Sequence, residues 1–312
     1  MNAVSSPKDL VAVIVNWRTP EFSIRAANAL IADGVAAKQV VIVDSASGDN
    51  SAERLAQSLP ECHHVQLEKN VGYGPACNAG ATTLVGNAYL FVNSDAFVHK
   101  PGSVAALLGA FANPKVGIAV PQLLNDDLTL QPSVVPLSRP LSELVRASGL
   151  SRVVPNELQP ALGTHWDHGR SRSIQAAIGA VLCVRAETWR ALGGFDERHF
   201  MYAEDHDLFW RAHKLDWSAW FVAEAQFVHI GNSSAVKRWA SPERAELVAR
   251  NEAAMLREHL GPISARATLG SMALGVGVRS IVWRIRGERE KAVEQQAWFR
   301  GYLTRKRSAR TR

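Results

Sequence analysis

Residues 11–17 read VAVIVNW, a continuous apolar run that ends at Asn16. Runs of this kind, rich in β-branched residues, are typical of strands that are buried on both faces. The same pattern recurs in QVVIVD at residues 39–44 and in YLFVNSD at residues 89–95, and each of these runs also ends on polar side chains. The sequence therefore predicts three buried strands with polar carboxyl ends.

Segments with helical spacing separate these runs, so that strand and helix alternate four times within the first 120 residues. The helical segments are 20–32, a short helix capped by Ser51, 75–84 and 102–111. A weak strand is expected at 64–67 and a further strand at 116–120. This alternation predicts an α/β fold with a Rossmann-like, mostly parallel central sheet flanked by helices. Ligands bind such sheets at the carboxyl ends of the strands, so we expect Asn16, Asp44 and residues 93–95 to face one crevice.

The second half of the chain has weaker periodicity. Residues 125–173 are rich in Pro, Ser and Arg, which predicts loops and one short helix near residues 141–147. Further strands are expected at 178–185 and 217–222, and further helices at 187–192, 205–213 and 242–259.

The composition limits the class of protein. The three cysteines, Cys62, Cys77 and Cys183, are scattered and odd in number, so neither a disulfide framework nor a structural zinc site is indicated and a reducing compartment fits best. We expect no signal peptide, because the N-terminus MNAVSSPKDL has no basic region followed by an apolar one. We expect no spanning helix, because no stretch reaches the roughly 18–20 apolar residues that a bilayer requires. Residues 257–312 hold 13 Lys and Arg against 4 Asp and Glu, a balance of +9 within a chain of net charge +6. Such a basic tail favours an anionic partner.

Two carboxylates stand directly after predicted strands. Asp44 can accept hydrogen bonds from a base or a ribose, although a solvated turn explains it as well. Asp95 can hold a divalent cation that bridges two phosphates, and the alternative is a helix-capping aspartate. His229 follows a strand and precedes Gly231, and it is either a further metal ligand or a structural histidine.

The segment NVGYGPACNAG at residues 70–80 contains two glycines that allow a phosphate to approach the backbone at a helix N-terminus. It is similar to the GxGxxG fingerprint of dinucleotide sites, but Cys77 stands at the third glycine position. A NAD(P)-dependent oxidoreductase is therefore one alternative function. The weak strand before Gly72 speaks against it.

The segment GGFDERHFMYAEDHDLFWR at residues 193–211 carries the strongest chemical signal. Adjacent carboxylates among aromatic residues, here Glu204 and Asp205, can raise one another's pKa and supply a general base. Asp205 also begins a predicted helix, whose dipole stabilises its charge. For Asp207 and Arg211, which stand four residues apart, we expect an ion pair along the helix.

Taken together, these segments resemble family 2 glycosyltransferases with the GT-A fold, and in particular the rhamnosyltransferase-like branch. The resemblance extends over residues 10–260 in the same order. The segments that carry it are VIVNW at 13–17, VDSASGDNS at 43–51, NVGYGPACNAG at 70–80, FVNSDA at 91–96, and GAVLCVRAETWRALGGFDERHFMYAEDHDLFWR at 179–211, with His229 after them.

The resemblance implies an inverting transferase in which Asp205, of the Glu204–Asp205 pair, is the general base. Asp44 would contact the nucleotide base. The donor-binding residues that it implies are Asn16, Asp44, Ser45, Asn70, Gly72, Gly74, Asn78, Asn93 and Asp95. Asp95, at the position of the family's DxD motif, and His229 would ligate Mg²⁺ or Mn²⁺ on the diphosphate. Asn93 replaces the first carboxylate of that motif, so the ion would have one fewer anionic ligand. The branch suggests dTDP-L-rhamnose as the donor.

We expect residues 1–260 to form the transferase domain, with a nucleotide-sugar half at 10–120 and an acceptor and catalytic half at 121–260. Residues 261–312 are expected to form a basic, amphipathic, helical C-terminal extension. It would bind anionic lipid, or else pack on the body of the protein or on a second subunit of a homodimer.

The expected acceptor is a glycan or a polyprenyl-diphosphate-linked acceptor of cell-wall or surface-polysaccharide assembly. The expected location is cytoplasmic, peripheral to the inner face of the cytoplasmic membrane. No nucleic-acid partner is expected, because the tail has no recognised binding module. A catalytically inactive GT-A-like binding protein is a further alternative, since Asn93 weakens the metal site.

Overall fold

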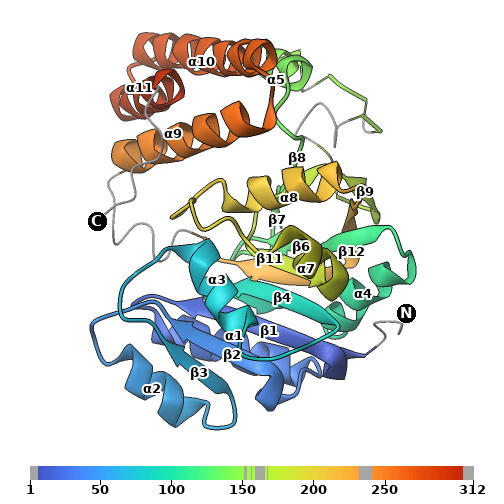
Figure 1. Ribbon diagram of the computed structural model, residues 1–312. Coiled ribbons are helices and arrows are strands. Elements are labelled where there is room, and N and C mark those ends of the chain that lie inside the picture. Colours follow the sequence, from blue (N-terminus) through green and yellow to red (C-terminus); the bar gives the residue numbers. More distant parts are fainter. Residues whose placement is uncertain are drawn as a thin grey trace.

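The computed structural model describes residues 6–150, 153–155, 157–158, 166, 168–231 and 241–304. The chain forms a mixed α/β fold with a curled central sheet and a helical C-terminal segment (Figure 1). The strands are Leu10–Asn16 (β1), Val40–Asp44 (β2), His63–Gln66 (β3), Ala88–Asn93 (β4), Ala96–Val98 (β5), Val116–Leu124 (β6), Leu130–Gln131 (β7), Val134–Val135 (β8), Arg172–Ile174 (β9), Ala176–Ala177 (β10), Val181–Arg185 (β11) and Ser218–His229 (β12). The helices are Pro20–Ala32 (α1), Ser51–Ser58 (α2), Tyr73–Ala81 (α3), Ser103–Gly109 (α4), Pro140–Ala147 (α5), Ala186–Leu192 (α7), Glu204–Lys214 (α8), Ser241–His259 (α9), Pro262–Ile285 (α10) and Arg289–Leu303 (α11).

The main sheet has the order β3-β2-β1-β4-β11-β6-β12-β5. Its first four strands are parallel, as the alternation of apolar runs and helices predicts. β11 then lies antiparallel to both β4 and β6, while β6 and β12 are parallel to each other. The expected parallel sheet is therefore interrupted at one central position. The apolar content of residues 178–185 predicts a buried strand, but burial on both faces carries no information about strand direction.

Two apolar layers cover the sheet, and the alternation within β1 shows why its sequence is continuously hydrophobic. Val11 and Val13 point into the layer that contains α3, α7 and α8. Leu10, Ala12 and Ile14 point into the opposite layer, which contains α1, α2 and α4. Because helices cover both faces of the sheet, ligands reach it mainly at the carboxyl ends of its strands, where the polar residues lie.

Helices α9, α10 and α11 stack beyond α8, on the side away from the sheet, and α5 packs at one end of α10 (Figure 1). Close contact between α11 and α9 depends on Gly301, since a Cβ there would lie 2.5 Å from the Ala249 Cβ. The sequence places a boundary at residue 260, and α9, on the transferase side of that boundary, packs along α11, which lies beyond it. None of the helices in the described ranges is long and apolar enough to cross a membrane.

Candidate active site

The carboxyl ends of β1 and β2 bring Asn16 and Asp44 side by side, because these residues are register partners in the parallel ladder. Asn16 is fully buried and Asp44 is 4% exposed. The Asp44 carboxylate accepts hydrogen bonds from Asn16 Nδ2 at 2.8 Å, Ser47 Oγ at 2.5 Å and Ser47 N at 3.1 Å. A carboxylate has about four acceptor positions. Asp44 is thus held rigidly, and these contacts leave room for one N–H of a ligand.

Ser45 and Asn70 extend this cluster towards the glycine segment. The Ser45 hydroxyl donates to Asn70 Oδ1 at 3.4 Å, and the same oxygen accepts the Gly72 N–H at 3.0 Å. Five of the residues expected to bind the donor, Asn16, Asp44, Ser45, Asn70 and Gly72, therefore lie in one connected network at the ends of β1, β2 and β3. The Ser47 side chain also belongs to this network, although no sequence pattern indicates its role.

Other parts of the protein's own chain pack against the two glycines at the start of α3, Gly72 at the N-cap and Gly74 in the first turn. Gly72 has φ +92°, and a Cβ there would lie 1.7 Å from the carbonyl oxygen of Phe200. That oxygen also accepts the Tyr73 N–H at 3.1 Å. At Gly74 a Cβ would lie 3.1 Å from the Phe195 Cβ. The Phe200 backbone and the Phe195 side chain thus fill the space directly beside these two glycines.

Asn78 in α3 binds the backbone of the loop at residues 195–200 through its side-chain amide. Its Nδ2 donates to the Phe195 carbonyl at 2.9 Å, and its Oδ1 accepts the Phe195 N–H at 2.9 Å. Both ends of the amide therefore bind the backbone of a residue 117 positions further along the chain. Asn78 holds the segment that leads to Glu204 and Asp205 against the nucleotide half of the fold.

A second polar cluster lies at the end of β4, where Asn93, Asp95 and His229 meet. The antiparallel pairing of β5 and β12 places His229 opposite Ala96, directly after Asp95. His229 Nε2 lies 3.5 Å from Asp95 Oδ1 and 3.5 Å from Asn93 Nδ2. Asp95 is 6% exposed. The sequence-based expectation that Asp95 and His229 lie together therefore agrees with the pairing of β5 and β12.

The cluster suits a divalent cation, because Gln131 orients His229. Gln131 Oε1 lies 2.8 Å from His229 Nδ1, and Gln131 Nε2 donates to the His229 carbonyl at 3.0 Å. An Nδ1–H that donates to Gln131 leaves the lone pair of Nε2 directed at Asp95 and Asn93. One carboxylate, from Asp95, and one imidazole, from His229, are acceptable ligands for Mg²⁺ or Mn²⁺, with substrate phosphates completing the shell.

Glu204 and Asp205 begin α8 after a strained turn, since Tyr202 has φ +66° and Ala203 has φ +79°. Left-handed backbone at non-glycine residues costs on the order of 1–3 kcal/mol and concentrates at functional sites. Asp205 Oδ2 accepts the Gly179 N–H at 2.8 Å, and Asp205 Oδ1 accepts the His206 N–H at 2.8 Å. The carboxylate of Asp205 is therefore fixed by two backbone donors at a helix N-terminus.

Glu204 lies in a different environment from its neighbour. It is 7% exposed, its Cβ lies close to Gly74, and Tyr73 and Cys77 are near its carboxyl group. Burial, together with the charge of Asp205, raises the pKa of Glu204 to about 8. Glu204 therefore holds a proton at neutral pH. The side chain of Asp205 points instead towards Gly179, in the loop just before β11.

The dipeptide Gly179–Ala180, just before β11, joins the two polar regions. The Ala180 carbonyl accepts the Asn93 N–H at 2.9 Å, and the Gly179 N–H binds Asp205. Only glycine fits at position 179, since a Cβ there would lie 2.8 Å from the Asp205 Cβ. Asp205 and the cluster of Asn93, Asp95 and His229 are thus held on consecutive residues of one loop.

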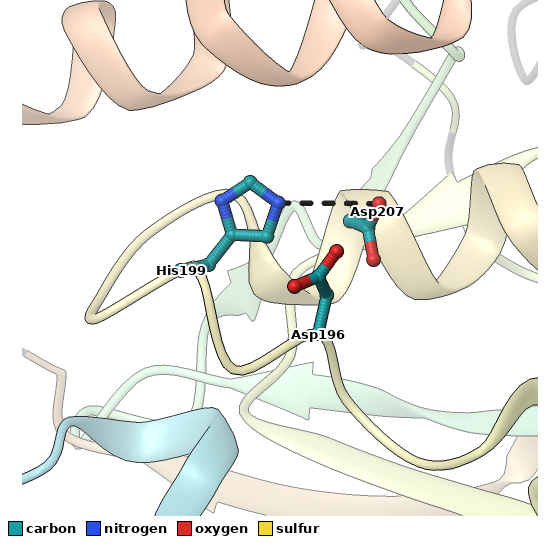
Figure 2. Close-up of side chains that lie close together, drawn as sticks. All are labelled: Asp196, His199 and Asp207. Atoms are coloured by element: carbon teal, nitrogen blue, oxygen red, sulfur yellow. Dashed lines mark ion pairs between the residues drawn. The ribbon is translucent and has the colours of Figure 1, made fainter. Parts of the chain in front are cut away.

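Asp196 and His199, in the loop before α8, form a further cluster with Asp207 of α8 (Figure 2), with ligand atoms within 4.8 Å of one another. Hydrogen bonds from Arg198 lower the pKa of Asp196 to about 2. Asp207 forms the expected ion pair with Arg211, whose Nε lies 2.7 Å from Asp207 Oδ2. Because a guanidinium group already balances each carboxylate, the cluster serves to hold the loop rather than to bind a cation.

Asp207 also binds the C-terminal helices. His259 Nε2, at the end of α9, lies 2.7 Å from Asp207 Oδ1. Arg211 Nη1 donates to the carbonyls of Leu192 and Gly194 at 2.9 Å each. Burial raises the pKa of Asp207, but the hydrogen bond from His259 and the charge of Arg211 outweigh it, so the pKa lies below its ordinary value. Asp207 thus connects α8, the loop before it and α9.

Comparison with known proteins agrees with this geometry. Residues 13–137 match the family model of glycosyl transferase family 2. Over 214 residues the chain is 29% identical to the N-acetylglucosaminyl-diphospho-decaprenol L-rhamnosyltransferases of two Mycobacterium tuberculosis strains, which covers 61% of this chain. The chain spans 66% of the length of these relatives, slightly under two thirds.

Two solved structures share the fold. A mannosyltransferase from Pyrobaculum calidifontis, PcManGT, in complex with GDP-Man and Mn²⁺, superposes with a TM-score of 0.56 at 13% identity and covers 96% of this chain and 88% of its own. Residues 1–349 of TarS from S. aureus superpose with a TM-score of 0.50 at 13% identity, covering 94% and 90%. Residues 13–137 therefore match glycosyl transferase family 2, and the chain has the GT-A fold that it shares with these glycosyltransferase structures.

Proposed function

We propose that this protein is an inverting glycosyltransferase that moves a sugar from a nucleotide diphosphate to a hydroxyl group of an acceptor. The observation that carries the proposal is the Gly179–Ala180 loop, which binds Asn93 through one residue and Asp205 through the other. A single displacement at the anomeric carbon needs a base beside the site that binds the leaving diphosphate. The Gly179–Ala180 loop holds the proposed base, Asp205, at a fixed position relative to Asn93 at the proposed diphosphate site.

Asp205 is the proposed general base. Each of its oxygens accepts one backbone N–H and retains a lone pair for an acceptor hydroxyl. Asp205 takes the hydroxyl proton while the acceptor oxygen bonds to the anomeric carbon. The bond from that carbon to the diphosphate breaks, and its electron pair leaves with the nucleoside diphosphate. Because attack and departure occur on opposite faces, the anomeric configuration is inverted.

Asp95 and His229, with Asn93 beside them, would hold Mg²⁺ or Mn²⁺ in this proposal. When bound, the cation offsets negative charge on the leaving diphosphate. Gln131 keeps His229 in the tautomer that this role requires. The nucleotide itself would lie against Asn16, Asp44, Ser45 and Asn70. Gly72, Gly74 and Asn78 support that site by positioning residues 195–200.

The name of the Mycobacterium tuberculosis relatives supports a finer proposal for donor and acceptor. We propose dTDP-L-rhamnose as the donor and a glycan linked to polyprenyl diphosphate as the acceptor, in cell-wall or surface-polysaccharide assembly. An acceptor of this kind is anchored in lipid. The protein would accordingly work at the inner face of the cytoplasmic membrane, as a peripheral protein.

Isothermal titration of dTDP, UDP and GDP, with and without Mn²⁺, tests the donor site. We expect one nucleotide to bind selectively, and we expect His229→Ala to weaken its binding about 10- to 100-fold in Mn²⁺ but not in the absence of metal. His63→Ala, at a half-buried histidine of β3, is the matched control and should bind like the wild type. Failure of all three nucleotides to bind in either condition would overturn the proposal, and NAD(H) would become the next ligand to test.

A further inference from the structure

Helix α10 is apolar on two opposite faces, and only one of them is buried. Leu269, Met272, Ala273 and Val276 pack into the core. The other face is a stripe of exposed side chains, which we call the α10 stripe: Ile263 (84% exposed), Leu274 (60%), Val278 (49%), Ile281 (60%) and Ile285 (81%). The last four are spaced by four, three and four residues and therefore lie on one side of the helix. A continuous apolar strip of this kind on a protein surface marks an interaction site.

Positive charge borders the α10 stripe. Arg266 and Arg284 are exposed, and they stand 18 residues apart, which is five turns of an α-helix, so they lie along the same edge. Arg286, exposed directly after the helix, lies towards the opposite edge. The 24 residues of α10 contain no Asp or Glu. The sequence after Thr304 contains five more basic residues, which lie outside the described residues.

We propose that the α10 stripe docks on an anionic lipid bilayer, with Ile and Leu side chains in the interface and the arginines at the headgroups. An apolar face bordered by arginines has the pattern of a helix that lies in the membrane plane. A second copy of the chain fits less well. Antiparallel pairing of two α10 helices would bring Arg284 of one copy near Arg266 of the other, and α10 provides no carboxylate to offset the repulsion.

Membrane docking by the α10 stripe deepens the proposed function and rests on it in one respect. The lipid-linked acceptor of that function is presented at a bilayer surface, which gives the protein a reason to bind there. The position of α10 supports it as well. The helix begins at Pro262, three residues after His259, whose ring binds Asp207 in α8, the helix that carries Asp205 in its first turn. A docked α10 therefore holds the helix of the proposed base at a fixed distance from the membrane.

Sedimentation with lipid vesicles tests the proposal without any transfer reaction. The full chain is mixed with phosphatidylcholine vesicles that either lack phosphatidylglycerol or contain about a third of it, a composition that gives an anionic surface. We expect binding to the anionic vesicles only, and weaker binding as salt is raised. Binding should fall at least tenfold in Leu274→Ser/Ile281→Ser/Ile285→Ser, and about ten- to thirtyfold in Arg266→Gln/Arg284→Gln.

The matched controls are Val85→Ser, at a residue that is 97% exposed elsewhere on the surface, and Lys115→Gln, at an exposed residue before β6. Both should sediment like the wild type, and unchanged circular dichroism spectra show that each variant is folded. Equal sedimentation of the triple variant and the wild type would overturn the proposal. So would a wild-type dimer in light scattering that the triple variant converts to a monomer, since the stripe would then be a subunit interface. If the protein sediments as expected but binds no nucleotide diphosphate, the proposed function is contradicted and the docking proposal is still supported.

Discussion

Replacing Asp207 with asparagine removes one charge from a side chain that is 1% exposed, with almost no change in shape. Two donors depend on that charge, Arg211 Nε and His259 Nε2, each at 2.7 Å. An asparagine accepts from one of them and presents its own N–H₂ to the other. His259 Nδ1 lies 2.9 Å from Lys214 Nζ and accepts from it, so Nε2 carries the proton and cannot become the acceptor.

The expected cost follows from the burial of the pair. Removing one partner of a buried ion pair destabilises a protein by about 3–5 kcal/mol. The Arg211 side chain is 22% exposed, and water relieves part of the loss, so we expect about 3 kcal/mol. Unfolding entropy of about 2.1 cal/mol/K per residue gives the 312-residue chain about 0.7 kcal/mol/K, which converts the loss into a fall in Tm of about 4–5 °C.

Urea and thermal unfolding at neutral pH measure this loss, with Asp196→Asn as the matched control. Asp196 also binds an arginine, but the Arg198 side chain is 62% exposed, and an exposed pair contributes at most about 1 kcal/mol. The folded pKa of Asp207 is depressed, so its contribution is present above the unfolded pKa of about 3.9 and is lost as pH falls through the folded pKa. The difference between wild type and Asp207→Asn should therefore shrink below about pH 4. Equal losses for the two variants at neutral pH would refute the role assigned to Asp207.

Three further predictions concern the surrounding residues. Gly72→Ala should lower the free energy of unfolding by about 3 kcal/mol or more, because its Cβ would meet the Phe200 carbonyl, whereas Gly109→Ala, in a helix with open space around it, should be neutral or slightly stabilising in the same melting assay. Gln131→Leu should weaken Mn²⁺ binding in the presence of the nucleotide about 10- to 100-fold by calorimetry, and unchanged affinity would contradict its proposed role in orienting His229. Glu204 has a raised folded pKa, so its stabilising contribution is complete below its unfolded pKa of about 4.3 and is lost as pH rises through about 8. Glu204→Gln should therefore match the wild type in urea unfolding near pH 4 and exceed it by a few kcal/mol near pH 9, and a constant difference across that range would contradict the burial of its charge.

The sequence predicts much of the nucleotide half because local patterns determine it. Each apolar run ends on a polar residue, and parallel pairing then places Asn16 opposite Asp44 without any further information. The Asp207–Arg211 pair follows in the same way from the spacing of a helix. The direction of β11 does not follow, since its residues are buried on both faces.

Local sequence patterns do not predict contacts between segments that lie far apart in the chain. Gly179, Ala180 and Gln131 were not singled out, because their roles depend on strand pairing and on loops that return to the sheet. The glycines at 72 and 74 suggested a phosphate, and only the structure shows that Phe200 and Phe195 fill the space beside them. The sequence left open whether the C-terminal extension packs on protein or lies on lipid. The structure shows that one face of α10 is buried against the protein while the opposite face is exposed.

The most direct test of the account is the transfer reaction itself, run with dTDP-L-rhamnose and a polyprenyl-diphosphate-linked N-acetylglucosamine and followed by NMR at the anomeric carbon. We predict a product of inverted configuration from the wild type, and a kcat about 10²- to 10⁴-fold lower in Asp205→Asn, with donor affinity unchanged. A product of retained configuration, or an Asp205→Asn variant with wild-type kcat, would contradict the assignment of Asp205 as the base of an inverting transferase.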